Sequence, residues 1–496
     1  MARRRSGLCP HLHRPRPVPA KHESGNRFPM TISAEPGLRR RFLTMLGPMI
    51  LTNILQAASG TINTIWVGQI LGVQAVAVVS SVFPLILLMF PVVIGIGSGA
   101  SVLIGQAWGA RDRDRMRAVA ANALILTACL GTFVSMLAVL STPVLLRVLK
   151  VPDALMGNAI TYTRILMAGM PALFVLWYVT MISRAVGDAV SPLRTLAVAA
   201  GISLSVTPLL LESWRLGLPH IGVGAAAFGS DLACVAAPLW LVWFWRRKNH
   251  ALAPSHPRHF RLDFSLWRSV LAIGLPTAGQ MIAMALAEMA LLSLVNQHGA
   301  SALAAYGAVN QILSWIQFPS LSIGITTTIF ASHLIGAGQK GRVRDVVRTG
   351  LFLNLLITGS TIACAYLAGP VVLRVFLTDP AVRATATHLL YIVLWSLLPF
   401  GLGMVFSGAL RADKVVLIPT VLAIAAIIGV EVPVAFRLEH RLGLEGIWWG
   451  YAAGYAAALT LQGGYYLYRH RGDTGRIDLT PARQARRAHP TSDRRP

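Results

Sequence analysis

The sequence predicts an all-α integral membrane protein in which twelve transmembrane helices form two six-helix repeats. Three observations support this fold class: an apolar composition, an internal duplication and a one-sided distribution of basic residues. Of the 496 residues, 55% are hydrophobic and only 13% are charged. The mean hydropathy is +0.61. A soluble domain of this length would not have such a composition.

The second half of the chain repeats the first half at an offset of 227 to 228 residues. Prolines and glycines within or beside apolar segments are the landmarks. The matching positions are Pro48 with Pro276, Pro91 with Pro319, Pro171 with Pro399, Pro192 with Pro419, Gly72 with Gly299, and Gly109 with Gly336. Duplicated hydrophobic bundles are typical of secondary transporters, which open a site near the membrane midplane to each side in turn.

A membrane-spanning helix needs about 20 predominantly apolar residues. Twelve stretches meet this condition: residues 43–67, 76–106, 118–141, 159–183, 193–212, 221–245, 268–296, 302–335, 347–372, 385–410, 414–436 and 444–468. Six fall in each half, and an even number of spans returns the chain to the side where it began. The two halves are therefore expected to share one orientation, related by an axis along the membrane normal.

The net charge of +25 follows the predicted topology. Of the 44 lysines and arginines, 36 lie in the two termini and in alternate loops, and eight lie on the other side. This asymmetry places both termini in the cytoplasm and the protein in the cell inner membrane. It also argues against nucleic acid as a partner, because anionic lipid headgroups suit such basic loops.

Composition divides the chain into five segments. These are a basic, disordered tail over residues 1–38, an N-lobe over 39–245, a cytoplasmic linker over 246–267, a C-lobe over 268–468 and a basic cytoplasmic tail over 469–496. A translation start at Met30 stays an alternative to Met1, because the upstream residues show no periodic pattern. The four cysteines lack paired spacing, so neither a disulfide framework nor a metal site is indicated.

The two equivalent helices 43–67 and 268–296 are unusually rich in glycine, proline and polar residues. The first contains Asn53, Gln56 and Asn63, and the second contains Gln280. Small and polar residues also hold membrane helices together without further function. Paired irregular helices in corresponding positions nevertheless point to a transport pathway. These four residues are therefore candidates for a substrate cavity.

Several motifs, spread over residues 40–468, carry a family resemblance. They are Thr61-Ile-Asn63-Thr-Ile-Trp-Val67-Gly68, Gln106-Ala-Trp-Gly109-Ala110, Arg184-Ala-Val-Gly187-Asp188 with Pro192, Leu275-Pro276, Glu288, Gly336-Ala-Gly338 and Gly443-Leu-Glu-Gly446-Ile-Trp448. In order and spacing the chain resembles the multidrug and toxic compound extrusion (MATE) transporters of the flippase-like superfamily. The resemblance implies two six-helix lobes around a cleft, and the exchange of protons or sodium ions for an exported organic compound, commonly a cation.

Two positions depart from the family pattern. Asn63 stands where many members carry an aspartate, and Thr207 replaces the usual acid before Pro208. Neither side chain binds and releases a proton under physiological conditions. Coupling through a carboxylate at these positions of the N-lobe is therefore not expected.

Glu288 is the leading candidate for cation coupling. It is the only acid in residues 268–296, and no lysine or arginine lies near it in the sequence. A charge at the bilayer centre costs about 2.5 to 3.5 kcal/mol on insertion scales, so such acids usually serve a function. Burial favours the neutral form of a carboxyl and so permits protonation. The resemblance also implies a coupling role for a glutamate in this helix.

Gln280, Met284 and Glu288 recur at helical spacing and should share one face. A structural interhelical hydrogen bond is the alternative role for Glu288. Asp231 and Glu431 are weaker coupling candidates, because both are predicted within a few turns of the outer helix ends.

Aromatic residues are further candidates for the substrate cavity. Tyr391 and Trp395 are four residues apart and share a helix face, as do Tyr306 and Asn310. An aromatic wall attracts organic cations by cation–π interaction. Packing and interface anchoring are the alternative roles for such residues.

The sequence thus predicts a proton-coupled, monomeric exporter of organic, cationic compounds that works by alternating access in contact with membrane lipids. Its alternatives are a sodium-coupled exporter and a lipid-linked oligosaccharide flippase, which should place Arg and Lys in the cavity. No cofactor besides H+ or Na+ is expected. An enzyme is disfavoured, because no clustered Asp, His or Glu marks a catalytic or metal site.

Overall fold

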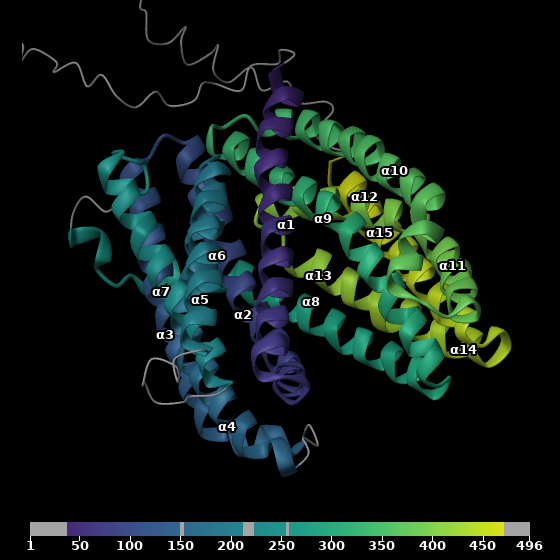
Figure 1. The fold of residues 1–496 in the computed structure, drawn as a ribbon. Helices are drawn as coiled ribbons and strands as arrows, with labels where there is room; N and C mark the ends of the chain where they lie inside the picture. The colour runs from purple at the N-terminus through teal and green to yellow at the C-terminus, as the bar shows by residue number, and fades with distance from the viewer. Residues whose placement is uncertain (1–36, 149–152, 212–222, 254–256, 471–496) are drawn as a thin grey trace, which may run out of the picture.

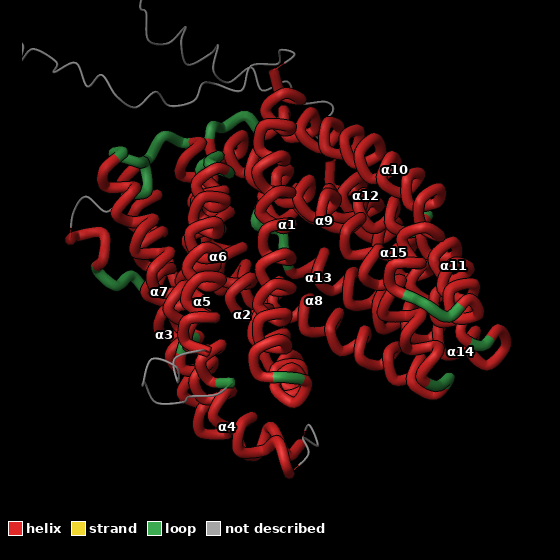
Figure 2. The backbone as a smooth tube through the Cα atoms, viewed as in Figure 1, coloured by secondary structure: helices red, strands yellow, loops and turns green. Residues whose placement is uncertain are grey.

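The computed structural model describes residues 37–148, 153–211, 223–253 and 257–470 (Figure 1). All regular secondary structure in these ranges is helical (Figure 2). The predictions about residues 1–36, the start at Met30 and the tail after residue 470 concern parts of the chain outside the described residues.

Each lobe contains six spans. The N-lobe spans are α1 (Gly37–Leu71), α2 (Val73–Gly109), α3 (Arg113–Val148), the pair α4 (Asp153–Ala168) and α5 (Met170–Ala185), α6 (Val190–Leu211) and α7 (Gly224–Arg247). The C-lobe spans are α8 (Phe264–Gln297), α9 (Ala300–Gly336), α10 (Val343–Phe376), the pair α11 (Pro380–Leu394) and α12 (Leu397–Ala412), the run α13 (Leu417–Ala426), η4 (Ile427–Glu431) and α14 (Val432–Leu442), and α15 (Leu444–His470). Two short 3-10 helices, η2 (Pro257–Phe260) and η3 (Lys340–Arg342), lie in loops.

The twelve predicted spans correspond to these helices. Within the described residues, ten helices are long and apolar enough to cross a membrane, and the pair α4–α5, bent by 44°, makes an eleventh span. The twelfth is α15, a helix of 27 residues. Its tyrosines and glycines lower its hydropathy, but it packs against α12, α13 and α14. The predicted twelve-helix fold class is confirmed.

The backbone conformation repeats along with the sequence. Gly72 and Gly299, which precede α2 and α9, have φ values of 83° and 89°. Only glycine adopts this left-handed conformation without strain. Two further pairs of left-handed residues, Arg111 with Gly338 and Gly187 with Lys414, also lie 227 positions apart. The turns of the two lobes are therefore built alike.

The lobes meet mainly through α1 and α2 of the N-lobe and α8 and α9 of the C-lobe (Figure 1). At one crossing of α2 and α8, a Cβ atom on Gly95 would lie 2.5 Å from the Gly274 carbonyl oxygen, and one on Gly274 would lie 2.8 Å from the Gly95 carbonyl oxygen. Small residues allow such close backbone packing between membrane helices. One apolar cluster contains both Phe42 near the start of α1 and Tyr466 near the end of α15, so the chain enters and leaves the bundle on one side, here called the terminal side.

Asp188 stabilises the turn between α5 and α6 on the terminal side. Its carboxylate accepts hydrogen bonds from the backbone N–H groups of Val190 (3.0 Å) and Ser191 (2.9 Å), and it lies 3.3 Å from Nε2 of His250. The His250 ring stacks on Trp245, with ring centroids 5.2 Å apart. Burial alone would raise the pKa of Asp188, but the hydrogen bonds from His250 and Ser191 outweigh this effect and lower it below the ordinary value of 3.8.

We expect Asp188→Asn to lower the free energy of unfolding by about 1 to 3 kcal/mol at neutral pH, because hydrogen bonds to a charged group are lost. A lowered carboxyl pKa contributes stability that is fully present at neutral pH and is lost only as the pH falls through the folded-state value, which lies below 3.8. Thermal unfolding in detergent measures the effect. Asp345→Asn, at an exposed position of α10, is the control. Equal melting temperatures for the two variants would contradict the assignment.

Candidate functional site

A cavity of about 160 Å³ lies within the C-lobe. Helices α8, α9, α12 and α15 and the run α13–η4 contribute its walls. Its polar lining residues are Gln280, Glu288, Asn310, Ser314, Gln317, Glu431, Tyr451, Tyr455 and Gln462. The cavity therefore contains two carboxyl groups among amide and hydroxyl groups, and no lysine or arginine of the described part of the chain lines it.

One wall of this cavity is formed by α8. Gln280, Met284 and Glu288 all line it, one helical turn apart, as their spacing predicts. Glu288 is an exposed residue of the cavity wall, and Met284 is 38% exposed. The Glu288 side chain thus lies at the surface of the cavity.

Glu431 lines the same cavity from the run α13–η4, where the backbone departs from α-helical geometry. Residues Ile427–Glu431 form a π-helical turn. Pro433, at the start of α14, lacks the N–H that would bond to the carbonyl four residues earlier, and its ring crowds that carbonyl. The helix widens at this point, as π-turns often do at functional sites. Glu431 is only 6% exposed, yet it lines the cavity.

The two carboxyl groups lie close enough to interact electrostatically. None of the ion pairs formed within the described parts of the chain involves either Glu288 or Glu431. Like charges in a shared low-dielectric site cannot both stay ionised at low cost. The pair is therefore suited to hold a proton or to bind a cation.

The Glu431 side chain packs against Gly454 of α15, where there is no side chain. A Cβ atom at position 454 would lie 2.6 Å from both the Cβ and the Oε2 atoms of Glu431. We expect Gly454→Ala to displace the Glu431 side chain and to reduce transport. Gly464→Ala on the same helix is a matched control, because a Cβ there meets nothing within 4 Å. Transport of a fluorescent cation in vesicles measures both variants, and equal rates would contradict this role of Gly454.

An aromatic wall completes the cavity, and the sequence analysis missed most of it. Tyr451 and Tyr455 line the cavity, and the Tyr455 ring packs on Phe400 with centroids 5.1 Å apart. Gln317 and Gln462 were also missed. The available signal was the helical spacing of the lining positions 451, 455, 458 and 462 in α15.

The aromatic candidates of the sequence analysis lie in different places. Asn310 lines the cavity, and Tyr306 lies behind the wall, where its hydroxyl is 3.0 Å from that of Tyr451. Tyr391 instead packs against Tyr366 of α10, and Trp395 faces Trp449 at a centroid distance of 6.4 Å. The structure does not place Tyr391 or Trp395 among the residues that line this cavity.

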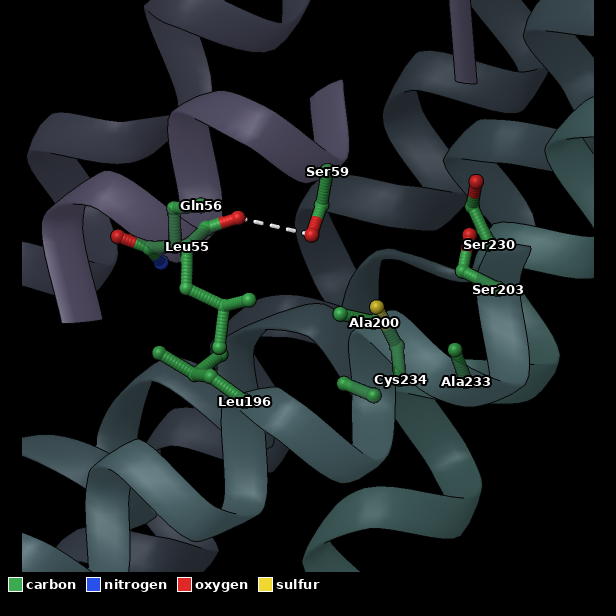
Figure 3. A pocket seen from close by; sticks show the side chains of 10 residues that line it. Leu55, Gln56, Ser59, Leu196, Ala200, Ser203, Ser230, Ala233 and Cys234 are labelled. Atoms are coloured by element: carbon green, nitrogen blue, oxygen red, sulfur yellow. Dashed lines mark hydrogen bonds between the residues drawn. The ribbon is translucent and has the colours of Figure 1, made fainter. Parts of the chain in front are cut away.

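The N-lobe contains a cavity of about 250 Å³ between α1, α6 and α7 (Figure 3). Its polar or thiol-bearing lining residues are Gln56 and Ser59 of α1, Ser203 of α6, and Ser230 and Cys234 of α7. Among the described residues, no acid or base lines this cavity.

Of the other N-lobe candidates, Asn63 lies beside this cavity, where its Nδ2 donates to the Ser203 hydroxyl over 2.9 Å. Asn53, half-buried on α1, lines neither cavity.

The two cavities occupy equivalent positions of the repeat. At an offset of 228, Gln56, Ser230 and Cys234 correspond to Met284, Ala458 and Gln462. At an offset of 227, Leu196 and Ala200 correspond to Ala423 and Ile427. Equivalent helix positions therefore line both cavities, but their side chains differ between the two lobes.

Asp231 of α7 packs against the bend between α4 and α5, and it does not line the N-lobe cavity. A Cβ atom on Gly169, the residue at this bend, would overlap the Asp231 carboxylate. The absence of a side chain at position 169 thus lets Asp231 pack against the break in the span.

The size of the C-lobe cavity limits what it holds. Drug-sized ligands occupy about 300 to 1,000 Å³, whereas one water takes about 30 Å³. A cavity of about 160 Å³ therefore suits a small ion with several waters. A larger substrate would need the space between the lobes.

A family model described as MatE matches the chain twice, over residues 48–209 and 276–436. The two matches begin 228 residues apart and end 227 residues apart, which is the offset of the duplication. The probable multidrug resistance protein YoeA of Bacillus subtilis is 38% identical over 439 residues, which cover 88% of this chain and 95% of that protein. The multidrug export protein MepA of Staphylococcus haemolyticus is 24% identical and covers 81% of this chain and 87% of its own length.

Solved structures show the same fold. A crystal structure of MATE in the straight conformation has a TM-score of 0.80 and 22% identity, and covers 88% of this chain and 97% of its own. The outward-facing conformation of a multidrug resistance MATE family transporter has a TM-score of 0.79, with the same identity and coverage. Given the two matches of the family model and the close relative, this chain belongs to the MATE family of multidrug efflux transporters and is a multi-pass membrane protein.

Proposed function

We propose that this transporter exports organic, cationic compounds across the cell inner membrane in exchange for protons, by alternating access of its two lobes. The observation that carries the proposal is the C-lobe cavity, where Glu288 and Glu431 meet without a basic partner. Glu288 takes up and releases the proton from the open side of the cavity. Glu431, shielded in the wall, lies close enough to interact electrostatically with this carboxyl group.

A single exchanged proton is enough to drive useful export. A potential of 100 mV supplies about 2.3 kcal/mol per charge, and each tenfold concentration ratio requires about 1.36 kcal/mol. One proton then supports roughly 50-fold accumulation of a neutral substrate. Exchange of one proton for a monovalent cation is electroneutral, so for such a substrate each unit of pH difference, rather than the potential, supports about a tenfold ratio. The proposal needs no cofactor and no second ion.

Sodium coupling is the second candidate, and the lining of the cavity favours it more than the sequence did. Side-chain oxygens of Asn310, Gln317 and Gln462 accompany the two carboxylates there. A sodium ion needs several such oxygen ligands. A lipid-linked oligosaccharide flippase is disfavoured, because within the described ranges no lysine or arginine that would bind a pyrophosphate lines either cavity.

The orientation and the partners form part of the proposal. The excess of basic residues in the termini and alternate loops supports cytoplasmic termini, so the terminal side faces the cytoplasm. The transporter is proposed to work as a monomer in contact with membrane lipids. Catalysis forms no part of the proposed function.

Proton efflux from inverted membrane vesicles tests the proposal. Vesicles that contain the protein are energised to an acidic interior and loaded with either choline or sodium chloride, and ethidium and other cationic dyes are added outside. We expect dye-dependent proton release from the choline-loaded vesicles, and none from vesicles without the protein. Dye uptake that occurs only in the sodium-loaded vesicles, without proton release, would replace the proton with sodium. Neither dye uptake nor proton release under either condition would overturn the proposal.

A further inference from the structure

Two helices of different lobes cross in backbone contact on the terminal side. Gly109 ends α2 and Gly336 ends α9, and the two glycines are equivalent in the repeat. A Cβ atom on Gly109 would overlap the His333 carbonyl oxygen, and one on Gly336 would overlap the Gln106 carbonyl oxygen. Gln106 and His333 also lie 227 positions apart. The contact is therefore reciprocal, as at a two-fold axis.

Two side chains extend across this crossing to the opposite lobe. His333 of α9 donates from Nε2 to the Ala185 carbonyl oxygen in the N-lobe over 2.7 Å. Gln106 of α2 donates from Nε2 to the Ala412 carbonyl oxygen in the C-lobe over 2.8 Å. Ala185 and Ala412 are the last residues of α5 and α12, and they too are equivalent in the repeat.

These acceptors are carbonyls that the helices themselves cannot satisfy. The last four carbonyl groups of a helix have no partner within it, and the chain turns away at once through the left-handed residues Gly187 and Lys414. His333 is only 9% exposed, so its bond is shielded from water. Each lobe thus caps a helix end of the other.

We propose that the bonds His333–Ala185 and Gln106–Ala412 form a paired latch that holds the lobes together on the terminal side. Both bonds must break before a passage opens there, because each joins α2 or α9 to a helix of the other lobe. Loss of one bond favours the open arrangement by roughly two- to tenfold in population. The inference rests on the alternating access of the proposed function, but on neither its substrate nor its coupling ion.

Distances between spin labels test the latch without any substrate. The labels are placed at Lys248, at the end of α7, and at Arg348 on α10, which are exposed positions of the N-lobe and the C-lobe. The variants are Gln106→Leu, His333→Leu and the two combined, in lipid nanodiscs. We expect the population with the longer distance to rise by two- to tenfold for each bond removed, and further in the combined variant.

Two controls separate a latch from a general packing defect. Tyr178→Phe removes a side-chain bond of similar kind within the N-lobe, from the Tyr178 hydroxyl to the Ala120 carbonyl over 2.7 Å, and should leave the distances unchanged. The exchange variant Gln106→His with His333→Gln keeps a donor at both positions and should retain the wild-type distribution. The latch is overturned if the leucine variants match the wild type, or if Tyr178→Phe or the exchange variant shifts the distances equally. A negative result in the proton-efflux test alone would not contradict the latch, because the spin-label distances are measured without substrate.

Discussion

Glu288→Gln is expected to abolish ion-coupled export while the protein still folds and inserts. Glutamine keeps the size and hydrogen-bonding capacity of the side chain but cannot release a proton. Because Glu288 is exposed on the cavity wall and has no basic partner among the described residues, its charge contributes little to packing. Dye-driven proton release in inverted vesicles should fall to the level of vesicles without the protein.

Glu431→Gln provides the companion measurement. If the two carboxyl groups act as one unit, the double variant should be no worse than Glu288→Gln alone, since residues in contact show non-additive effects. Glu445→Gln, at a carboxylate that pairs with His388 outside the cavity, is the control and should retain export. Full coupled export by Glu288→Gln would contradict its role. Additive losses of export in the double variant would show that the two acids act independently.

Gly109→Ala and Gly336→Ala should each strongly reduce both the population of the closed arrangement and export. In each case the added methyl group meets a backbone carbonyl of the other lobe, which cannot rotate away as a side chain would. Overpacking of this kind costs about 1 to 3 kcal/mol, or roughly 5- to 150-fold in the population of the closed arrangement. We expect both variants to favour the longer spin-label distance and to lose export.

Gly359→Ala on α10 is the matched control for these glycines, because a Cβ there meets nothing within 4 Å. All three variants are compared at equal expression and with monodisperse elution in detergent. A wild-type distance distribution in Gly109→Ala would show that the crossing tolerates a side chain, and the packing argument would then be wrong.

The fold was accessible from the sequence because the signals for it are local and occur twice. Apolar stretches locate the spans, and paired landmarks such as Gly72 and Gly299 locate equivalent turns. Residues 444–468 are among the predicted spans, although the tyrosines and glycines of α15 lower its hydropathy. The repeat supports this span as well, since a six-helix lobe requires it.

The candidate site was accessible only in part. The face of α8 that carries Gln280 and Glu288 follows from helical periodicity. The position of Glu431 does not, because a π-turn shifts the register of every later side chain and the apolar pattern of the sequence gives no sign of one. The sequence also does not show which helices, far apart along the chain, pack against one another. Nothing in the spacing of Tyr391 and Trp395 distinguishes their surroundings from those of Tyr451 and Tyr455.

The equivalence of the two cavities separates what the architecture requires from what was added to it. Position 288 corresponds to Gly60 at an offset of 228, and position 431 corresponds to Leu204 at an offset of 227 or to the cavity-lining Ser203 at 228. One half of the molecule thus serves as an internal control for the other. The N-lobe assembles its helices without a carboxylate at either position. The two acids of the C-lobe cavity, which carry the cost of placing charge within a membrane, are therefore not required by the shared architecture and distinguish one lobe from the other.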